Sequence, residues 1–508
     1  MTRRATLSGA RVCVAVLALV ASVASVVGSE LDGVQADAAT RFLDGATSST
    51  EPPRIENFAN GDVISYSVAL LRGTAPGVER GTVVVENLSS SRATRVTRAP
   101  VVAGRFKVLV ELVPGENRLT LAVGDARIDF FLTRRPDDNP RFVRLIYFVD
   151  STGDETFATP EFWTANDAKN AEIGQNRGNE AVLTDGATVE ASTETTRTDE
   201  KTSNNFRAKI GTAALLWQTA TAERLNDAGY GRRTFSLELD EAGDPVVWVL
   251  RGEKTAAEYA ALSETERFRA IYREIEASKL TSEFARYFVS VAFARKLGEM
   301  DATETVGEVE QERGNAQNEA VERSGDDRTK TFLTISTIGE VGENKRSGEN
   351  AGSGEKNAIG EIAERGRPGA TWARVALGGG SVAALDASTL FSWPDSLVDV
   401  ADAFADARPI PEDFAADSGF RRTRWALTAS TLGAGLHELG HAFGLDHSTA
   451  PIDFMSRGFD RFNRIFTVVE PPDATSPNAV ESVFDDESAA TWTPESANRL
   501  IRSRWIEK

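Results

Sequence analysis

The stretch HELGHAFGLDH, from His437 to His447, contains all three histidines of the 508-residue chain. On a helix, residues four apart lie on one face, so His437 and His441 can direct two imidazoles toward one metal ion. Glu438 follows the first of them, where its carboxylate can reach a metal-bound water without binding the metal. Gly444 can adopt the left-handed conformation that ends a helix, which lets His447 return as a third ligand. Three protein ligands with one open position predict a single catalytic zinc ion.

A methionine further along the chain supports this interpretation. Met455 lies eight residues after His447, in the stretch DFMSRG. The pattern H-E-x-x-H-x-x-G-x-x-H followed by a methionine turn is the signature of the metzincin branch of zinc proteases. A bare HExxH occurs by chance on unrelated helices, and the alternative is three core histidines that cluster without a metal. The extension by Gly444, His447 and Met455 favours the zinc site.

Composition and the N-terminus indicate the compartment. A net charge of −19 argues against nucleic acid as a partner, since a phosphate-binding face would be basic. Residues 1–29 have a basic start and an apolar run, and they predict a secretory signal peptide. An uncleaved membrane anchor at 12–28 is the alternative. The only cysteine, Cys13, lies in this segment, so an exported, mature chain would have no disulfides and no cysteine ligands.

The N-terminal third is predicted to be all-β. After a polar, flexible linker at 30–53, short β-rich runs alternate with turn residues over 54–136. Many short strands at this spacing predict an immunoglobulin- or fibronectin-like sandwich, acting as a spacer or positioning substrate. Asn87-Leu88-Ser89 is a glycosylation sequon. The predicted strands cover 63–71, 81–89, 94–101, 106–112, 117–123 and 127–133.

Residues 141–508 are predicted to form an α+β catalytic domain after a linker at 136–140. Residues 171–205 and 300–369 have little to bury and predict disordered insertions. Strands are predicted at 141–150 and 286–294, and a hairpin around Gly243 joins 234–240 to 245–251. Helices are predicted at 206–228, 255–277, 394–405, 425–443 and 494–506.

A glycine run precedes the histidine helix. Gly378, Gly379 and Gly380 interrupt an apolar segment, which indicates a close backbone approach. In zinc proteases, a strand beside the cleft binds extended substrate through main-chain hydrogen bonds, so these glycines are candidate substrate-binding residues. A hairpin turn or a bulge explains them equally well.

The segment 437–467, HELGHAFGLDHSTAPIDFMSRGFDRFNRIFT, resembles the core of a fungal-type zinc metallopeptidase family with metzincin-like features. The resemblance extends to RFVRLIYFVD (141–150), AALLWQTATAERLNDAGYGRRTF (213–235), ALGGGSVAALDASTLFSWPDSL (376–397) and TPESANRLIRSRW (493–505). It implies that His437, His441 and His447 bind zinc and that Glu438 is the catalytic base. The histidine stretch is also similar to the matrixins, but the mature chain has no cysteine for a cysteine switch.

The predicted activity is peptide-bond hydrolysis by zinc-activated water, with Glu438 taking the proton and passing it to the leaving amine. We expect an exported endopeptidase acting on protein or peptide substrates. One alternative is an exported binding or adhesion protein that keeps zinc for stability, although such a site has no need of Glu438. A zinc amidase or aminopeptidase is another.

Overall fold

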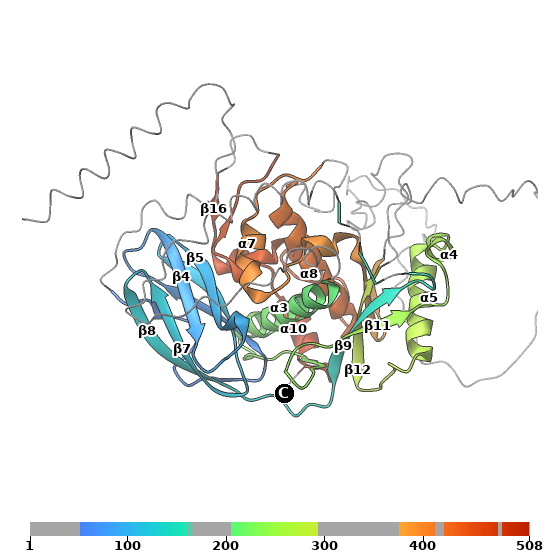
Figure 1. The fold of residues 1–508 in the computed structure, drawn as a ribbon, viewed down its shortest axis with the longest axis horizontal. Coiled ribbons are helices and arrows are strands. Elements are labelled where there is room, and N and C mark those ends of the chain that lie inside the picture. The colour runs from blue at the N-terminus through green and yellow to red at the C-terminus, as the bar shows by residue number, and fades with distance from the viewer. Residues whose placement is uncertain are drawn as a thin grey trace, which may run out of the picture. The chain divides into compact units, whose positions relative to one another are not determined.

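The computed structural model describes residues 51–153, 155–157, 159–160, 163, 205–292, 375–411, 421–475 and 480–506. The predicted signal peptide, most of the 30–53 linker and, apart from Asn205, both predicted insertions lie outside these ranges. The described residues form a mixed α/β structure with two large sheets (Figure 1).

The first sheet comprises eight strands, and each of the six predicted β-rich segments overlaps at least one of them. Its spatial order is β1-β3-β6-β5-β4-β7-β8-β2. The strands are β1 (Arg54–Ile55), β2 (Val63–Ile64), β3 (Val68–Thr74), β4 (Arg80–Asn87), β5 (Val96–Val102), β6 (Arg105–Glu111), β7 (Gly115–Val123) and β8 (Ala126–Arg134). A short 3-10 helix, η2 (Ala93–Arg95), precedes β5.

This first sheet curls around its own core. β5 and β6 share only the two residue pairs next to their turn, whereas each pairs over seven residues with its other neighbour. Val83 of β4, Val108 of β6 and Leu121 of β7 consequently meet in one buried cluster. All eight strands belong to one hydrogen-bonded path. The division into two sheets that an immunoglobulin-like sandwich requires stays a prediction.

The glycosylation sequon is closed to modification in this fold. The side chain of Asn87 is fully buried, and its Nδ2 donates to the Glu111 carbonyl and to Asn117 Oδ1, both at 2.8 Å. A glycan would have to be attached to that same nitrogen. The folded chain therefore cannot use this sequon.

The second sheet has six strands in the order β10-β9-β12-β14-β13, and β11 also pairs with β9. All of its pairings are parallel except that of β13 with β14, which makes β13 an antiparallel edge strand. The strands are β9 (Phe142–Val149), β10 (Ser236–Leu237), β11 (Val247–Arg251), β12 (Ala285–Val291), β13 (Ala376–Gly379) and β14 (Val382–Asp386).

The hairpin predicted around Gly243 is wrong in its pairing. β10 and β11 both run parallel to β9, and only the bridge between Leu239 and Pro245 is antiparallel. The chain thus leaves the side of β9 after β10, turns at Gly243, and returns to the same side of β9 as β11. Local turn residues revealed the reversal of the chain but not the partner strand, because β9 lies about a hundred residues earlier in the sequence.

Helices cover both faces of the second sheet. Alternate residues of β9 point to opposite faces, as the strand geometry requires. Leu145 and Tyr147 share a core with α3 (Phe206–Asp227) and α8 (Arg424–Ala442). Ile146 and Phe148 pack with α4 (Ala256–Ala260) and α5 (Glu264–Ala277) on the other face. Figure 1 shows α3 and α8 on one side of β9 and β12, and α5 on the other.

The remaining described elements are short. They are the helices α7 (Val400–Ala405), α9 (Asn463–Phe466) and α10 (Pro494–Leu500), the 3-10 helices η3 (Ala387–Ser392), η4 (Leu397–Asp399), η6 (Arg457–Arg461) and η7 (Asp486–Ser488), and the strand pair β15 (Val469–Glu470) and β16 (Ser482–Val483). The predicted helix at 494–506 thus ends at Leu500, and the one at 394–405 begins only at Val400.

The two sheets are separated in the sequence at 136–140 but are joined by a common core. Val68 and Leu70 of β3 and Leu109 of β6 belong to the same buried cluster as α3 and α8. The Thr219 hydroxyl of α3 also donates to the Val68 carbonyl at 2.9 Å. The N-terminal sheet is therefore packed on the histidine-bearing part of the chain.

A group of charged side chains lies at this junction, and we name it the interface charge cluster. Glu223 of α3 is its most buried acid, with a side chain only 1% exposed, and it accepts hydrogen bonds from Asn57, Tyr66 and Arg232. The cluster comprises Arg72 and Lys107 from the N-terminal sheet, Glu223, Arg224, Asp227 and Arg232 from α3 and the loop that follows it, and Asp486 from η7.

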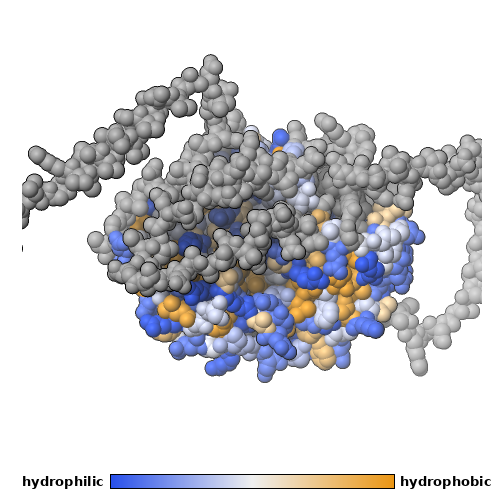
Figure 2. All heavy atoms as spheres, viewed as in Figure 1, coloured by the Kyte–Doolittle hydropathy of each residue, from blue (hydrophilic) through white to orange (hydrophobic). Residues whose placement is uncertain are grey.

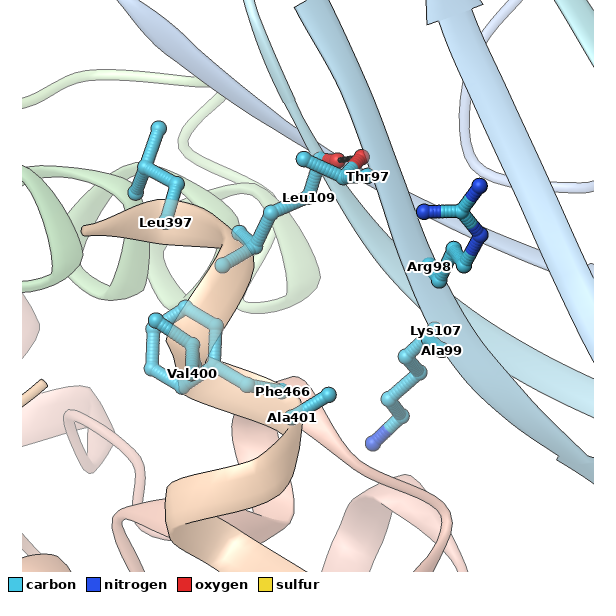
Figure 3. A pocket seen from close by; sticks show the side chains of 9 residues that line it. All are labelled: Thr97, Arg98, Ala99, Lys107, Leu109, Leu397, Val400, Ala401 and Phe466. Atoms are coloured by element: carbon cyan, nitrogen blue, oxygen red, sulfur yellow. Dashed lines mark hydrogen bonds between the residues drawn. The ribbon is translucent and has the colours of Figure 1, made fainter. Parts of the chain in front are cut away.

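A small cavity lies at the same junction. It has a volume of about 10 Å³ and is lined by residues of β5 and β6 on one side and of η4, α7 and α9 on the other. Figure 3 shows Lys107 and Phe466 on its wall. A cavity of this volume holds about one water molecule, so the junction has no room here for an organic ligand.

The described surface has few exposed large apolar side chains. Figure 2 shows apolar residues over β9 and β12 among mostly polar ones. The exposed ones are Val63, Leu88, Trp248, Phe284, Val398, Val480 and Val483. No helix within the described ranges is both long enough and apolar enough to cross a lipid bilayer.

Candidate metal centre

Helix α8 and the turn after it carry the three histidines. His437 and His441 are one turn apart on α8, which ends at Ala442. Gly444 has φ +92°, its N–H donates to the His441 carbonyl, and the Leu445 N–H donates to the Gly440 carbonyl. These two bonds form a Schellman motif, in which only glycine adopts the left-handed conformation without strain. The reversed chain then brings His447 back beside the helix.

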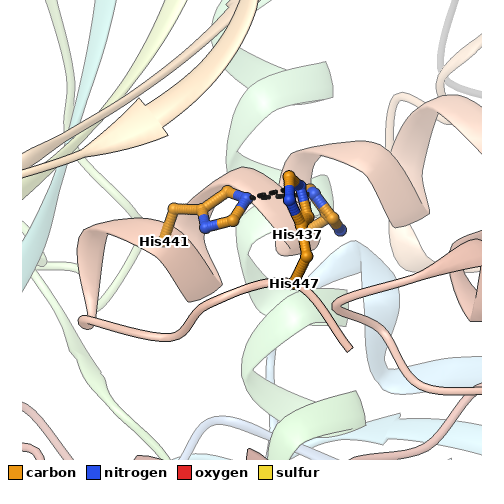
Figure 4. A group of neighbouring side chains, drawn as sticks. All are labelled: His437, His441 and His447. Carbon is orange, nitrogen blue, oxygen red and sulfur yellow. Dashed lines mark hydrogen bonds between the residues drawn. The ribbon is translucent and has the colours of Figure 1, made fainter. Parts of the chain in front are cut away.

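The three imidazoles converge through their Nε2 atoms. The Nε2 of His441 lies 3.2 Å from that of His437 and 3.2 Å from that of His447 (Figure 4). Ligand atoms of the three residues all lie within 4.8 Å of one another. Zinc–nitrogen bonds of about 2.0–2.1 Å in a tetrahedral site place neighbouring nitrogens about 3.4 Å apart. The spacing therefore fits a zinc ion.

Hydrogen bonds fix which nitrogen faces the centre in two of the three rings. His437 Nδ1 lies 2.7 Å from the Phe454 carbonyl oxygen, and His441 Nδ1 lies 2.8 Å from that of Leu445. A carbonyl only accepts, so each Nδ1 must carry the proton and each Nε2 must present a lone pair. Two lone pairs 3.2 Å apart repel each other unless a cation lies between them. The donor set thus fits a metal on chemical as well as geometric grounds.

The environment keeps the three rings neutral. Burial, with the neighbouring His441 second, lowers the pKa of His437 to about 3. Burial likewise lowers the pKa of His441 to about 4, and it lowers the pKa of His447. Neutral imidazole is the form that binds metal, so this site needs no deprotonation step near neutral pH.

Glu438 is held in a dry environment beside the first histidine. Its side chain is almost completely buried, at 1% exposure. Burial raises the pKa of this carboxyl well above its ordinary range, and the negative charge of Glu264 on α5 adds to the rise. A carboxylate with a raised pKa binds a proton more readily, which suits a group that accepts a proton and later returns it.

Met455 lies against α8 within the same group of residues. It is fully buried, and a Cβ added at Gly440 would come within 3.0 Å of its Sδ. Its carbonyl also accepts a hydrogen bond from the N–H of Ser448, the residue after His447, at 2.8 Å. The structure therefore brings the predicted methionine turn to the helix turn that carries His437 and His441.

The three glycines of the 378–380 run lie in different environments. A Cβ on Gly378 would come within 3.0 Å of the Glu438 carbonyl and of His441 Cβ, so the edge strand β13 passes directly over the histidine helix. Gly379 has nothing within 4 Å of such a Cβ. Gly380 has φ +60° in the hairpin turn between β13 and β14. The hairpin-turn alternative is therefore correct for Gly380, and the close approach is correct for Gly378.

Several residues at this site are absent from the sequence-based prediction. The carbonyls of Phe454 and Leu445 orient two ligands, and no side-chain letter signals such a role. Glu264, which influences Glu438, is separated from it by more than a hundred residues. Asp453, two residues before Met455, is completely buried and bonds to the methionine turn.

Comparisons with known proteins point to proteases. The model of a family described as "Putative peptidase family" (Metallopep) matches residues 52–175 and 184–507. The chain is 40% identical over 100 residues to a Schizosaccharomyces pombe protein named as a putative zinc metalloproteinase, covering 19% of this chain and 16% of that protein. It is 33% identical over 138 residues to a similarly named Saccharomyces cerevisiae protein, covering 26% and 19%. The chain thus matches less than a fifth of each curated relative.

Two solved structures show a weak similarity. Wild-type OgpA from Akkermansia muciniphila matches with a TM-score of 0.32 and 11% identity, covering 73% of this chain and 62% of that one. Catalytically inactive OgpA in complex with an O-glycopeptide, glycodrosocin, matches with a TM-score of 0.32 and 9% identity over the same fractions.

Proposed function

Because the chain belongs to the Metallopep family of peptidases, we propose that it is a zinc-dependent endopeptidase whose ion is held by His437, His441 and His447. The observation that carries this proposal is the convergence of three Nε2 lone pairs, two of them fixed by Nδ1 hydrogen bonds to carbonyls. Glu438, the remaining functional residue of the motif, is the proposed general base.

The chain's own groups have separate roles in this proposal. A bound zinc ion supplies Lewis acidity, which activates water and polarises the scissile carbonyl. Glu438 accepts the proton that water loses and delivers it to the departing amine, for which its high proton affinity is suitable. The outer edge of β13, next to Gly378, binds an extended substrate through main-chain hydrogen bonds. Gly379 leaves open space beside this edge, whereas Gly380 lies against the ring of Tyr272.

The same proposal includes the fold type of each domain and the export of the protein. A parallel sheet with one antiparallel edge strand above a histidine helix supports a zincin-like catalytic domain of the metzincin type, preceded by a sandwich-like N-terminal domain. The apolar run at 12–28 supports export by a signal peptide or retention by an anchor.

The test compares the parent protein with Glu438→Gln. We expect about one zinc per chain in both, and cleavage of a peptide library by the parent that a chelator abolishes. The variant should lose about 10²- to 10⁴-fold in kcat because it cannot accept the proton. Mass spectrometry of the products separates internal cleavage from removal of N-terminal residues or of side-chain amides.

The matched control is Glu276→Gln on the exposed face of α5, which should cleave like the parent. Zinc in the parent and in Glu438→Gln, with no cleavage by either, would favour the binding or adhesion alternative. A parent that binds no zinc would contradict the proposed function itself.

A further inference from the structure

The segment Phe454–Met455 is hydrogen-bonded through all four of its backbone polar groups. The Phe454 carbonyl accepts from His437 Nδ1, and the Met455 carbonyl accepts from the Ser448 N–H. In the other direction, the Phe454 N–H donates to the Thr491 carbonyl at 2.9 Å, and the Met455 N–H donates to Asp453 Oδ1 at 2.9 Å. The Phe454 carbonyl thus contacts a ligand and the Met455 carbonyl contacts the residue after another ligand, while the two N–H groups bond to Thr491 and Asp453.

Asp453 connects this segment to the C-terminal helix α10. Its carboxylate is completely buried, and each oxygen serves a different element. Oδ1 accepts from the Met455 N–H, whereas Oδ2 accepts from the Thr493 N–H at 3.2 Å, from the Thr493 hydroxyl and from the Ser496 hydroxyl at 2.6 Å. Every partner of this carboxylate is therefore a donor in these bonds.

Helix α10 is also attached to the other side of the metal centre. Arg499 forms an ion pair with Asp446, the residue immediately before His447. Nearer its start, the ring of Trp492 packs against that of Phe454, with centroids 4.6 Å apart. The segment 491–499 thus contacts the chain at Asp446, beside the ligand His447, and at Phe454, whose carbonyl orients the ligand His437.

We propose that Asp453 is a positioning residue which, held by Thr493 and Ser496, fixes the Phe454 carbonyl against His437 and so makes the metal affinity of the centre depend on helix α10. This inference rests on the proposed zinc site. It assigns to the C-terminal segment a role that no ligand motif indicates.

The physical basis is the orientation of the first histidine. Groups that hydrogen-bond to a ligand imidazole fix its ring plane and raise its basicity, and their loss typically weakens metal affinity or activity about 10- to 100-fold. Because the Phe454 carbonyl belongs to the backbone, it cannot be removed by substitution. Its position is set by its neighbours, and Asp453 is the neighbour whose side chain holds the turn.

The experiment uses Asp453→Asn and Ser496→Ala in the full-length protein. In Asp453→Asn, the amide NH₂ replaces one of the two accepting oxygens, so it faces N–H or O–H donors and loses the hydrogen bonds on that side. In Ser496→Ala, only one hydroxyl that donates to Asp453 is removed. We expect the zinc dissociation constant, measured by competition with a chromophoric chelator, to rise about 10-fold in Asp453→Asn and several-fold in Ser496→Ala. At saturating zinc, kcat should fall while KM stays near that of the parent.

Asp150→Asn is the matched control. Asp150 is also buried, and it also bridges a turn to the start of a helix, since Oδ1 accepts from Thr152 and Oδ2 from the Ala256 N–H. It should lose stability but bind zinc like the parent, which separates positioning from general destabilisation. The absorption spectrum of the cobalt-substituted proteins should differ from the parent only in the two test variants.

The inference is overturned if folded Asp453→Asn and Ser496→Ala bind zinc as tightly as the parent. If Asp453→Asn does not fold, the milder Ser496→Ala variant decides. A parent without zinc affinity would instead refute the proposed function, so the two failures are distinguishable.

Discussion

At the scale of single residues, the space around Gly378 is a strict constraint beside the histidine helix. A hydrogen is all that fits between β13 and the backbone of α8 at this position. Its neighbour Gly379, on the same strand, has open space where a side chain would begin. The two residues therefore offer a comparison in which the chemistry of the change is identical and only the surroundings differ.

Gly378→Ala should lower the free energy of unfolding by about 1–3 kcal/mol, because its methyl group would overlap the Glu438 carbonyl and His441 Cβ. Gly379→Ala should stay within about 0.5 kcal/mol of the parent. Urea unfolding of the zinc-free proteins measures both changes. Equal free energies of unfolding for the two variants would show that β13 can move away from α8 without loss of stability.

The role of a residue can be predicted from the sequence when it depends on the side chain and its spacing from other residues. The interval between His437 and His441 is a property of any helix, and Gly444 is required by the turn that follows. The two carbonyls that orient the imidazoles carry no such signal, because every residue has one. Asp453 was missed for another reason: its partners Thr493 and Ser496 lie some forty residues away, in a helix whose docking the sequence does not reveal.

At the scale of elements, α3 supports the histidine helix from behind. Trp217 of α3 is fully buried, and its indole Nε1 donates to the Leu432 carbonyl of α8 at 2.7 Å. A Cβ at Gly435 would come within 3.0 Å of its ring, so the two helices meet closely at this point. Phe288 of β12 packs on the same ring, with centroids 4.5 Å apart. The tryptophan thus joins α3, α8 and the sheet.

Trp217→Phe should lower the free energy of unfolding by about 2 kcal/mol, since it removes a buried hydrogen bond and leaves a gap where the second ring was. The control Trp248→Phe changes a side chain that is 39% exposed and should alter stability by less than about 1 kcal/mol. Thermal unfolding measures both. A loss that is no larger for Trp217→Phe than for Trp248→Phe would contradict this account of the helix pair.

Hydrophobic periodicity predicted which segments form helices and strands. It did not predict where a helix ends or which strand a given strand pairs with. The helix predicted at 255–277 is two helices, because Ser263 and Glu266 form a second capping box within it. That signal, Ser followed three residues later by Glu, is present in the sequence and repeats the one at Thr255 and Glu258. The pairing of β10 and β11 with β9, in contrast, depends on contacts that no local pattern contains.

At the scale of the whole molecule, the interface charge cluster has four cations and three anions among its named members. Burial lowers the pKa of Arg224 in this cluster, and Lys107 is affected in the same direction. Burial, aided by Arg224 and Arg72, lowers its pKa to about 8 despite its ion pair with Asp486. Asp486 responds in the opposite direction: Lys107, Arg72 and Arg224 outweigh its burial and lower its pKa. Burial is thus the largest cause of the shift in Lys107, and the surrounding positive charges contribute to both shifts.

The low pKa of Lys107 predicts a pH-dependent contribution to stability. Between about 8 and 10.5, the unfolded chain binds a proton at this residue more often than the folded chain does. The free energy of unfolding contributed by Lys107 therefore rises with pH across this window. We expect the parent to gain stability relative to Lys107→Met as the pH increases from about 8 to about 10.5, as measured by urea unfolding.

Other groups titrate over the same range, so only the difference between parent and variant is informative. Lys279→Met, at an exposed position on the surface, should show no such trend. A constant difference between the parent and Lys107→Met across the window would mean that folding leaves the pKa of Lys107 unchanged.

The sequence places a linker at 136–140 and thereby suggests two independent parts. The partners of the interface charge cluster show why this view is incomplete. Arg72 and Glu223 are 151 positions apart, and Lys107 lies 357 positions from Arg464, whose carbonyl it contacts. Neither half contains a local signal for the other, because each charged residue by itself resembles an ordinary surface residue.

The shared junction also constrains how such a chain can have been inherited. A gene fragment encoding residues from 141 onward would leave Glu223 without Arg72 and Tyr66, and would expose the apolar positions that Val68 and Leu109 cover. Recombination that exchanged the N-terminal sheet for an unrelated module would incur the same loss. We therefore expect that replacing either part alone destabilises the junction unless matching substitutions are made on the other side.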